Sequence, residues 1–235
     1  MKRSKRYQGA ATLVDPGTAY SIDQAIAKLK EGATADFDET AEVALTLGIK
    51  ASQVVVRGTC NLPHGTGRSV RILAFAKGES VAEAEAAGAD YVGGEDLAKR
   101  IQGGWFEFDK VVATPDMMPV VGKLGKLLGP RGLMPSPKSG TVAKDIGRVI
   151  EELKKGMIEY RSDRYGVIHT IFGKASFEPE ALKENLIAVI RSIAERRPEE
   201  GVKGRFVKKV TIASTMGPGI PIDLEEVNRL MEGTG

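Results

Sequence analysis

The chain has 235 residues, which at about 100 to 200 residues per domain predicts one large domain or two small ones. Hydrophobic residues make up 42% and charged residues 28%, so a core can be buried, and disorder and collagen-like repeats are excluded. The 34 Lys and Arg against 31 Asp and Glu give a formal net charge of +3. This excess is too small for a protein that coats nucleic acid without regard to sequence. Any nucleic acid must be bound by a local surface.

The cysteine and hydropathy patterns favour a soluble protein of the cytosol. Cys60 is the only cysteine, so no intrachain disulfide can form, and no Cys or His cluster has metal-ligand spacing. The basic start lacks the apolar core of a signal peptide, and no window approaches the about 18 apolar residues of a membrane span. We expect no metal, no cofactor, no small-molecule substrate and no membrane contact.

Three parts of the chain differ in pattern. The first has a Ser21–Gln24 capping box, which predicts a helix up to Gly32. Alternating residues then predict strands at 35–47 and 54–62. From residue 67, strands predicted at 69–76, 91–92 and 111–113 alternate with helices predicted at 80–87, 95–102, 117–128 and 142–155. This alternation is typical of βαβ units on a parallel sheet.

After residue 157 the pattern of the first part returns. Strands are predicted at 157–161, 167–171 and 206–214, with an amphipathic helix over 182–193. We therefore predict a discontinuous domain of residues 1–66 plus 158–235 and an inserted domain of residues 67–157. The expected hinges are Gly65, Thr66 and Gly67 at one crossing and Gly156 at the other.

Enzyme motifs are not found. Gly65–Ser69 lacks the glycine and lysine positions of a P-loop, and no dinucleotide-binding glycine pattern occurs. His64 is interpreted as a turn residue rather than a catalytic one. Carboxylates are scattered, so no catalytic pair can be named and we predict a non-enzyme.

Two segments have unusual chemistry. Residues 120–140 read VVGKLGKLLGPRGLMPSPKSG and contain Lys123, Lys126, Arg131 and Lys138 without any acidic residue. They form either a solvated basic helix and a shaped loop or a phosphate-contacting patch. Residues 214–219 read STMGPG and follow a predicted strand. They form either an ordinary turn or a recognition loop in which hydroxyls bind ribose and a methionine packs on a base.

A set of motifs resembles one family. They are FDET, VRG, LPHGTG, GADYVGGEDL, ATPDMM, LGPRGLMPSPK, IHTIFGK and STMGPG, in this order. Together they resemble the ribosomal protein L1 family of bacterial type, over roughly residues 20–222. The resemblance implies an α+β two-layer sandwich from both chain ends and an inserted Rossmann-like three-layer α/β domain. It also implies binding of large-subunit ribosomal RNA at the stalk, help in the release of deacylated tRNA from the exit site, and repression of translation of the protein's own messenger RNA. The expected location is the ribosome in the cytoplasm, and off the ribosome the protein is expected to be a monomer.

The resemblance implies an RNA-binding set on the first domain. It comprises Phe37, Thr40, Glu42, Arg161, Asp163, Arg164, His169, Lys174, Ser214, Thr215, Met216 and Gly217. The residues Lys123, Lys126, Arg131 and Lys138 are expected to contact RNA secondarily or to fix their loop. Asp36 stands where family members often have a basic residue, and the stretch 48–56 is about two residues shorter than usual.

Two rival hypotheses stay open. One is a nucleotide- or small-molecule-binding enzyme that uses a crevice at the strand carboxyl ends of the middle domain. The other makes residues 67–157 a protein-docking module. The missing glycine fingerprint argues against the first, and a pull-down with residues 67–157 would test the second.

Overall fold

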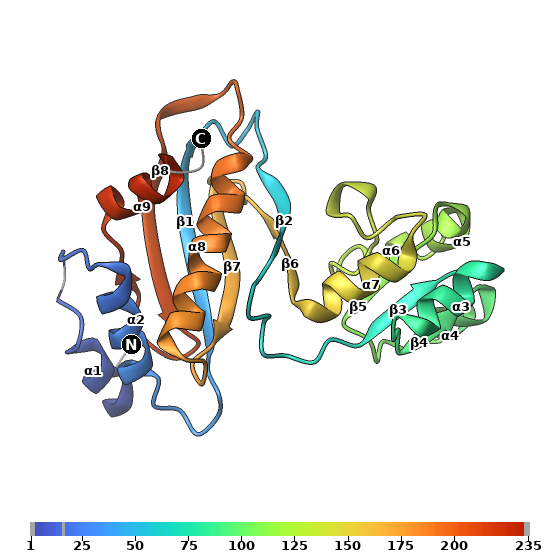
Figure 1. Cartoon of the computed structure of the whole chain (residues 1–235), viewed down its shortest axis with the longest axis horizontal. Helices are drawn as coiled ribbons and strands as arrows, with labels where there is room; N and C mark the ends of the chain where they lie inside the picture. Colours follow the sequence, from blue (N-terminus) through green and yellow to red (C-terminus); the bar gives the residue numbers. More distant parts are fainter. Residues whose placement is uncertain (1–2, 16, 233–235) are drawn as a thin grey trace. The chain divides into compact units, whose positions relative to one another are not determined.

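The computed structural model describes residues 3–15 and 17–232, apart from the side chains of Lys138, Lys203 and Glu232. The chain divides into two compact units (Figure 1). The end unit is built from the chain up to Gly67 and from Gly156 onward, and the inserted unit is Arg68–Lys155. Within the described ranges, no helix has the length and apolar character needed to cross a bilayer.

The end unit contains a four-stranded antiparallel sheet of order β7-β1-β8-β9 and a separate β2-β6 pair. Its helices and strands are α1 (Lys5–Ala11), α2 (Ile22–Gly32), β1 (Thr40–Ile49), β2 (Arg57–Asn61), β6 (Met157–Arg161), β7 (Val167–Lys174), α8 (Pro179–Glu195), β8 (Val202–Ser214), β9 (Ile220–Pro221) and α9 (Leu224–Glu232).

The four-stranded sheet has one covered face and one open face. Helices α2, α8 and α9 pack on the covered face (Figure 1). Alternation along β1 explains this arrangement, because Val43 and Leu45 are buried in the core, whereas Glu42 and Ala44, which alternate with them, face the helix-free side and are not buried. The open face consists of Glu42, Ala44 and Thr46 of β1, Val167, His169 and Ile171 of β7, and Lys209, Thr211 and Ala213 of β8, none of which is fully buried.

Several predicted elements are confirmed. Helix α2 begins with the predicted capping box, in which the Ser21 hydroxyl and the Gln24 side chain each accept a backbone N–H of the other residue. The helix predicted at 95–102 and the strand predicted at 157–161 have the predicted bounds. Strand β1 begins at Thr40 instead of residue 35, because the preceding residues form a loop held by Glu39.

The inserted unit is a parallel sheet of order β4-β3-β5. Its elements are β3 (Ile72–Phe75), α3 (Glu79–Ala86), β4 (Tyr91–Gly93), α4 (Glu95–Gln102), β5 (Lys110–Ala113), the 3-10 turns Pro115–Met117 and Pro137–Ser139, α5 (Met118–Gly122), α6 (Gly125–Leu128) and α7 (Ile146–Lys155). Leu73 and Phe75 of β3 pack in one core cluster with α4. The alternate residues Ile72 and Ala74 are also fully buried, so both faces are covered. The predicted fold class, with α+β and α/β parts, is confirmed.

The helix predicted over residues 117–128 is wrong. The segment is broken into a 3-10 turn, α5 and α6, and α5 ends at Gly122 while α6 begins at Gly125. Each glycine costs roughly 1 kcal/mol in a helix interior relative to alanine. Apolar residues at helical spacing are therefore not enough to form one continuous helix across Gly122 and Gly125.

The two chain crossings between the units are packed against each other. Gly156 has φ of +111°, and a Cβ atom there would lie 2.4 Å from the Gly65 Cα. The fully buried Asn185 donates its amide to the Gly65 carbonyl at 3.0 Å and accepts the His64 N–H at 3.0 Å. The His64 ring lies 2.6 Å from the Glu184 carboxylate, which agrees with a turn residue. A hinge role for Gly65, Thr66, Gly67 and Gly156 stays a prediction.

Gly156→Ala is expected to lower the free energy of unfolding by about 2 to 3 kcal/mol, because the clash is with backbone and the positive φ adds strain. Gly104→Ala is the matched control, since Gly104 has φ of +92° but nothing near the added carbon. Chemical denaturation of both variants separates the energetic cost of the steric clash from the cost of placing alanine at a positive φ. Equal losses would contradict the close packing of the crossings.

Candidate RNA-binding surface

The open face carries three rows of side chains across the sheet. The strand register pairs Glu42 with Ile171 and Ala213, Ala44 with His169 and Thr211, and Thr46 with Val167 and Lys209. Alanine and threonine dominate the two central strands, so a ligand can approach the backbone closely. The exposed polar groups are the Glu42 carboxylate, the His169 ring and the Lys209 ammonium. The face therefore presents a surface of defined shape with a few polar side chains, rather than a broad patch of positive charge.

A tight turn follows β8 at one end of this face. The Gly217 N–H donates to the Ser214 carbonyl at 3.1 Å, which places Thr215 and Met216 at the tip. The Met216 side chain is 46% exposed. A Cβ atom at Gly217 would lie 2.4 Å from the Ser214 Oγ, so glycine is needed there. The turn presents an apolar side chain to solvent from a fixed backbone.

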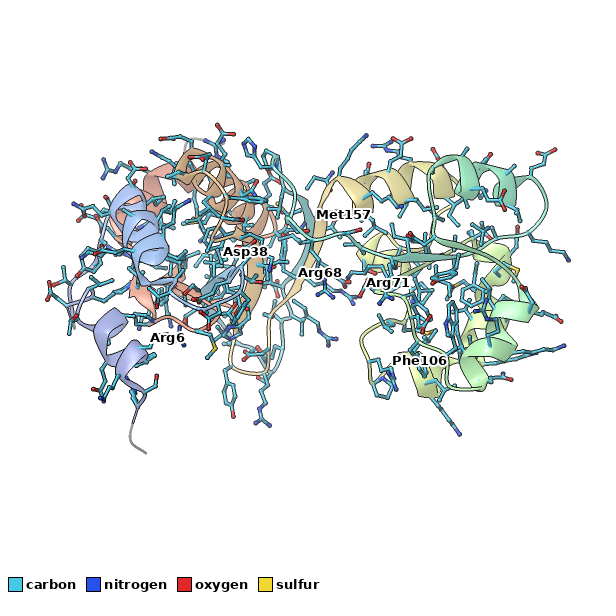
Figure 2. All side chains as sticks on the ribbon, turned by 90° about the horizontal axis from the view of Figure 1, so that it is seen from below. Arg6, Asp38, Arg68, Arg71, Phe106 and Met157 are labelled. Carbon is cyan, nitrogen blue, oxygen red and sulfur yellow. The ribbon has the colours of Figure 1, made fainter. Side chains whose placement is uncertain are left out.

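The start of β1 joins this turn. The Thr215 Oγ1 accepts the Thr40 N–H at 2.9 Å, and the Lys174 ammonium donates to the Thr40 Oγ1 at 3.0 Å and to the Asp38 carbonyl at 3.1 Å. Asp38 is labelled in Figure 2. Phe37, on the loop before β1, is 54% exposed. Four predicted site residues from three distant segments are thus brought to one edge.

Glu39 holds this edge together, although it is not among the residues predicted for the site and only its place in FDET pointed to it. Its side chain is 1% exposed, and its carboxylate accepts the Met216 N–H at 2.8 Å and the Ala35 N–H at 3.0 Å. Burial by itself raises the pKa of Glu39. The opposite effect comes from the hydrogen bonds of the Ser214 hydroxyl and of these two N–H groups, together with the Arg6 guanidinium. These groups outweigh burial, so the pKa of Glu39 is below its ordinary value. Glu39 is therefore ionised at neutral pH.

Ser214 differs from the other predicted contacts. It is 5% exposed, and its hydroxyl is engaged with Glu39. Its place favours a positioning role rather than direct contact with a ligand. Arg6, labelled in Figure 2, reaches the same carboxylate at 3.8 Å.

A second group lies at the turn between β6 and β7. Arg161, Arg164 and His169 are exposed. The Asp163 carboxylate accepts the Val167 and Tyr165 N–H groups, each at 2.8 Å, and the Val167 bond, with smaller effects of Tyr165 and His169, lowers the pKa of Asp163. Asp163 thus shapes the turn. Tyr165, which is not among the predicted site residues, is 70% exposed at the tip of this turn. The Arg164 guanidinium lies 4.9 Å from the Tyr165 ring centroid.

The predicted secondary contacts belong to the inserted unit. Lys123 and Lys126 are exposed, and the exposed Arg131 places its guanidinium 3.8 Å from the ring centroid of Phe106, which is labelled in Figure 2. The side chain of Lys138 lies outside the described part of the chain. The Arg131 guanidinium therefore makes a cation–π contact with Phe106.

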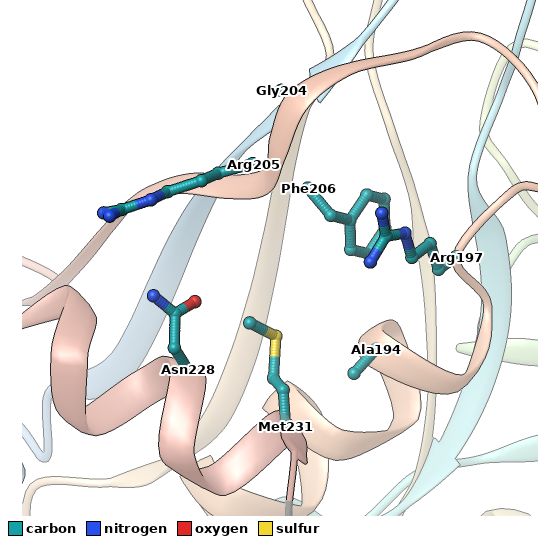
Figure 3. Close-up of a pocket in the computed structure, with 7 residues that line it drawn as sticks. All are labelled: Ala194, Arg197, Gly204, Arg205, Phe206, Asn228 and Met231. Carbon is teal, nitrogen blue, oxygen red and sulfur yellow. The ribbon is translucent and has the colours of Figure 1, made fainter.

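A pocket of about 440 Å³ lies near the start of β8 (Figure 3). It is lined by Ala194, Arg197, Gly204, Arg205, Phe206, Asn228 and Met231. Phe206 precedes Ser214, the last residue of β8, by eight positions, which at about 3.3 Å per residue separates the two by roughly 26 Å. The pocket is therefore distinct from the surface that carries the predicted site.

The fold defines a two-unit protein of the α/β and α+β class with an exposed sheet face. Residues 29–218 match the model of the Ribosomal protein L1p/L10e family. The chain is 54% identical over 235 residues to the large ribosomal subunit protein uL1 of Fervidobacterium nodosum, covering 99% of this chain and 98% of the relative. It is 54% identical over 225 residues to uL1 of Thermus thermophilus, covering 94% and 98%, and 52% identical over 226 residues to uL1 of Thermobifida fusca, covering 95% of each.

The chain belongs to the ribosomal protein L1p/L10e family. It is therefore a structural component of the ribosome, located in the cytoplasm, and not an enzyme. The predicted family is confirmed, and the enzyme hypothesis for the middle domain is excluded.

Proposed function

We propose that the chain is a constituent of the large ribosomal subunit and binds large-subunit ribosomal RNA through the open face and the turn of Ser214 to Gly217. The relatives named above are large-subunit proteins. The observation that carries the proposal is the open face, whose small side chains end at an edge with exposed Phe37 and Met216. Apolar side chains beside hydroxyls fit unstacked bases and ribose 2′-OH groups.

The residues have distinct roles in this proposal. Phe37 and Met216 pack on bases or sugars, and Glu42 accepts a hydrogen bond from a base amine or a 2′-OH. Arg161, Arg164 and Lys174 neutralise phosphates, and His169 adds a contact on the open face. Thr40 and Thr215 bond to each other, so they position the edge as well as offering oxygen atoms to RNA. The net charge of +3 fits recognition of one folded site.

The finer parts of the proposal rest on the family resemblance. The RNA site is at the base of the stalk, and the bound protein assists the release of deacylated tRNA from the exit site. The same surface represses translation of the protein's own messenger RNA by binding a structure that imitates the ribosomal site. Off the ribosome the chain is a monomer, and the turns containing Gly65 to Gly67 and Gly156 act as hinges.

Met216→Ala is expected to weaken binding to a stalk ribosomal RNA fragment by about 1 to 3 kcal/mol, because it removes an apolar contact without disturbing the backbone bonds. Filter binding measures the loss. Val81→Ala, which truncates a half-exposed apolar side chain of α3, is the control. Thr215→Ala should weaken binding similarly, and Thr215→Ser should restore it by keeping the hydroxyl that joins Thr40. Wild-type affinity of Met216→Ala would remove the turn from the site.

A further inference from the structure

Helix α1 and the two residues before it place basic side chains beside the exposed Met216. A depression of about 360 Å³ is lined by Arg3, Ser4, Arg6, Tyr7 and Met216. The segment from Arg3 to Val14 contains no acidic residue. Lys5, the first residue of α1, stands between the lining residues Ser4 and Arg6 in sequence and is exposed. Two segments more than 200 positions apart in sequence thus meet in one hollow with cations on one side and a thioether on the other.

The position of α1 is fixed through the same carboxylate that holds the Ser214 turn. Glu39 accepts the Met216 N–H and lies 3.8 Å from the Arg6 guanidinium. The helix is capped by the Ser4 hydroxyl, which accepts the Tyr7 N–H at 3.3 Å, and it buries Ala10. A group that packs on Met216 therefore meets α1 at a defined place.

The charge on Arg3 and on the first turn of α1 is largely uncompensated. Arg6 offsets Glu39, but among the described residues neither Arg3 nor Lys5 takes part in an ion pair. The Arg3 side chain is exposed, and its guanidinium lies 4.6 Å from the Tyr7 ring centroid. Planar guanidinium groups and an ammonium group suit phosphate oxygens.

We propose that α1 and Met216 form a nucleotide subsite of the RNA surface, in which Arg3 and Lys5 neutralise phosphates of the strand whose base or sugar packs on Met216 and Tyr7. This proposal rests on the proposed RNA-binding function and extends the surface beyond the residues that the family resemblance implies. A polyanionic strand explains both sides of the hollow, because phosphates alternate with apolar base and sugar faces along it.

The test compares the double variant Arg3→Ala/Lys5→Ala with Arg191→Ala/Arg229→Ala, which removes two exposed cations from α8 and α9 on the covered side. Each full-length protein is titrated with a stalk ribosomal RNA fragment, and with a fragment of altered sequence, at several salt concentrations. We expect the first variant to lose about tenfold in affinity and to reduce the slope of log K against log salt by about 1 to 2. Its preference for the stalk fragment should be unchanged, and the control should match wild type.

The single variant Arg3→Lys separates charge from structure. Arg3→Ala should reduce the salt slope, whereas Arg3→Lys should keep the slope of wild type, since lysine keeps the charge. All variants should have the same midpoint of thermal unfolding as wild type. Equal affinity and equal slope for the α1 variant and the control would overturn the subsite while leaving the RNA-binding proposal intact. A wild-type protein that shows no preference for the stalk fragment would instead overturn the proposed function, and the subsite with it.

Discussion

Replacing Glu39 with alanine is expected to lower the free energy of unfolding by about 2 to 4 kcal/mol, because it leaves two part-buried N–H donors and a buried hydroxyl without their acceptor. The donors are the Met216 and Ala35 N–H groups and the Ser214 hydroxyl. The loss should be accompanied by weaker RNA binding, since the Ser214 turn and the loop before β1 both lose their anchor. Urea denaturation followed by circular dichroism measures the first effect, and filter binding measures the second.

Glu42→Ala is the matched control for stability, because Glu42 is an exposed glutamate three positions away on the open face. Its effect on unfolding should stay within about 0.5 kcal/mol. If Glu39→Ala were as stable as Glu42→Ala, Glu39 would not hold the edge.

The same contacts predict a pH dependence. The pKa of Glu39 is lower in the folded protein than its ordinary value, so the unfolded chain takes up this proton first as pH falls. The stabilisation by Glu39 is therefore fully present above the unfolded value of about 4.3 and is lost as pH falls through the lower folded pKa. The difference in stability between wild type and Glu39→Gln should shrink over this acidic range. A difference that grows toward acid pH would contradict the assignment.

Ala44→Glu is expected to weaken RNA binding by at least about 3 kcal/mol, since like charges brought together at an interface cost several kcal/mol. Ala44 lies in the middle row of the open face, between His169 and Thr211. A carboxylate there would meet the phosphates or base edges of an RNA laid across the sheet. The fold should tolerate the change, because the position is only half-buried.

Strong local patterns made much of the fold predictable from sequence. The Ser21–Gln24 capping box and the apolar spacing of the long helix α8 are signals that lie within the element itself, so each could be recognised from its own stretch of sequence. Conflicting local signals caused the failure at residues 117–128, where apolar periodicity was outweighed by Gly122 and Gly125. Helix α9 was missed although its signals were present, since Asp223 precedes apolar residues at helical spacing, including Val227 and Leu230.

The candidate site was only partly predictable. The exposed Met216 and Phe37 stood out through the resemblance and through their neighbours in sequence. Glu39 did not, because its partners lie up to 177 positions away and no local pattern distinguishes a buried carboxylate from an exposed one. The open-face residues Lys209 and Thr211 could have been selected, since they alternate with the buried Val210 and Ile212 of β8.

The most direct test of the central claim, that the open face binds RNA, is a titration of wild type, Ala44→Glu and Ala27→Glu with a stalk ribosomal RNA fragment at one salt concentration. Ala27 is exposed on α2, which packs on the covered face, so both variants carry the same added charge on opposite sides of the sheet. We predict that Ala27→Glu binds nearly as wild type does, while Ala44→Glu loses about 100-fold or more. Equal binding by the two variants would contradict the open face as the RNA-binding surface.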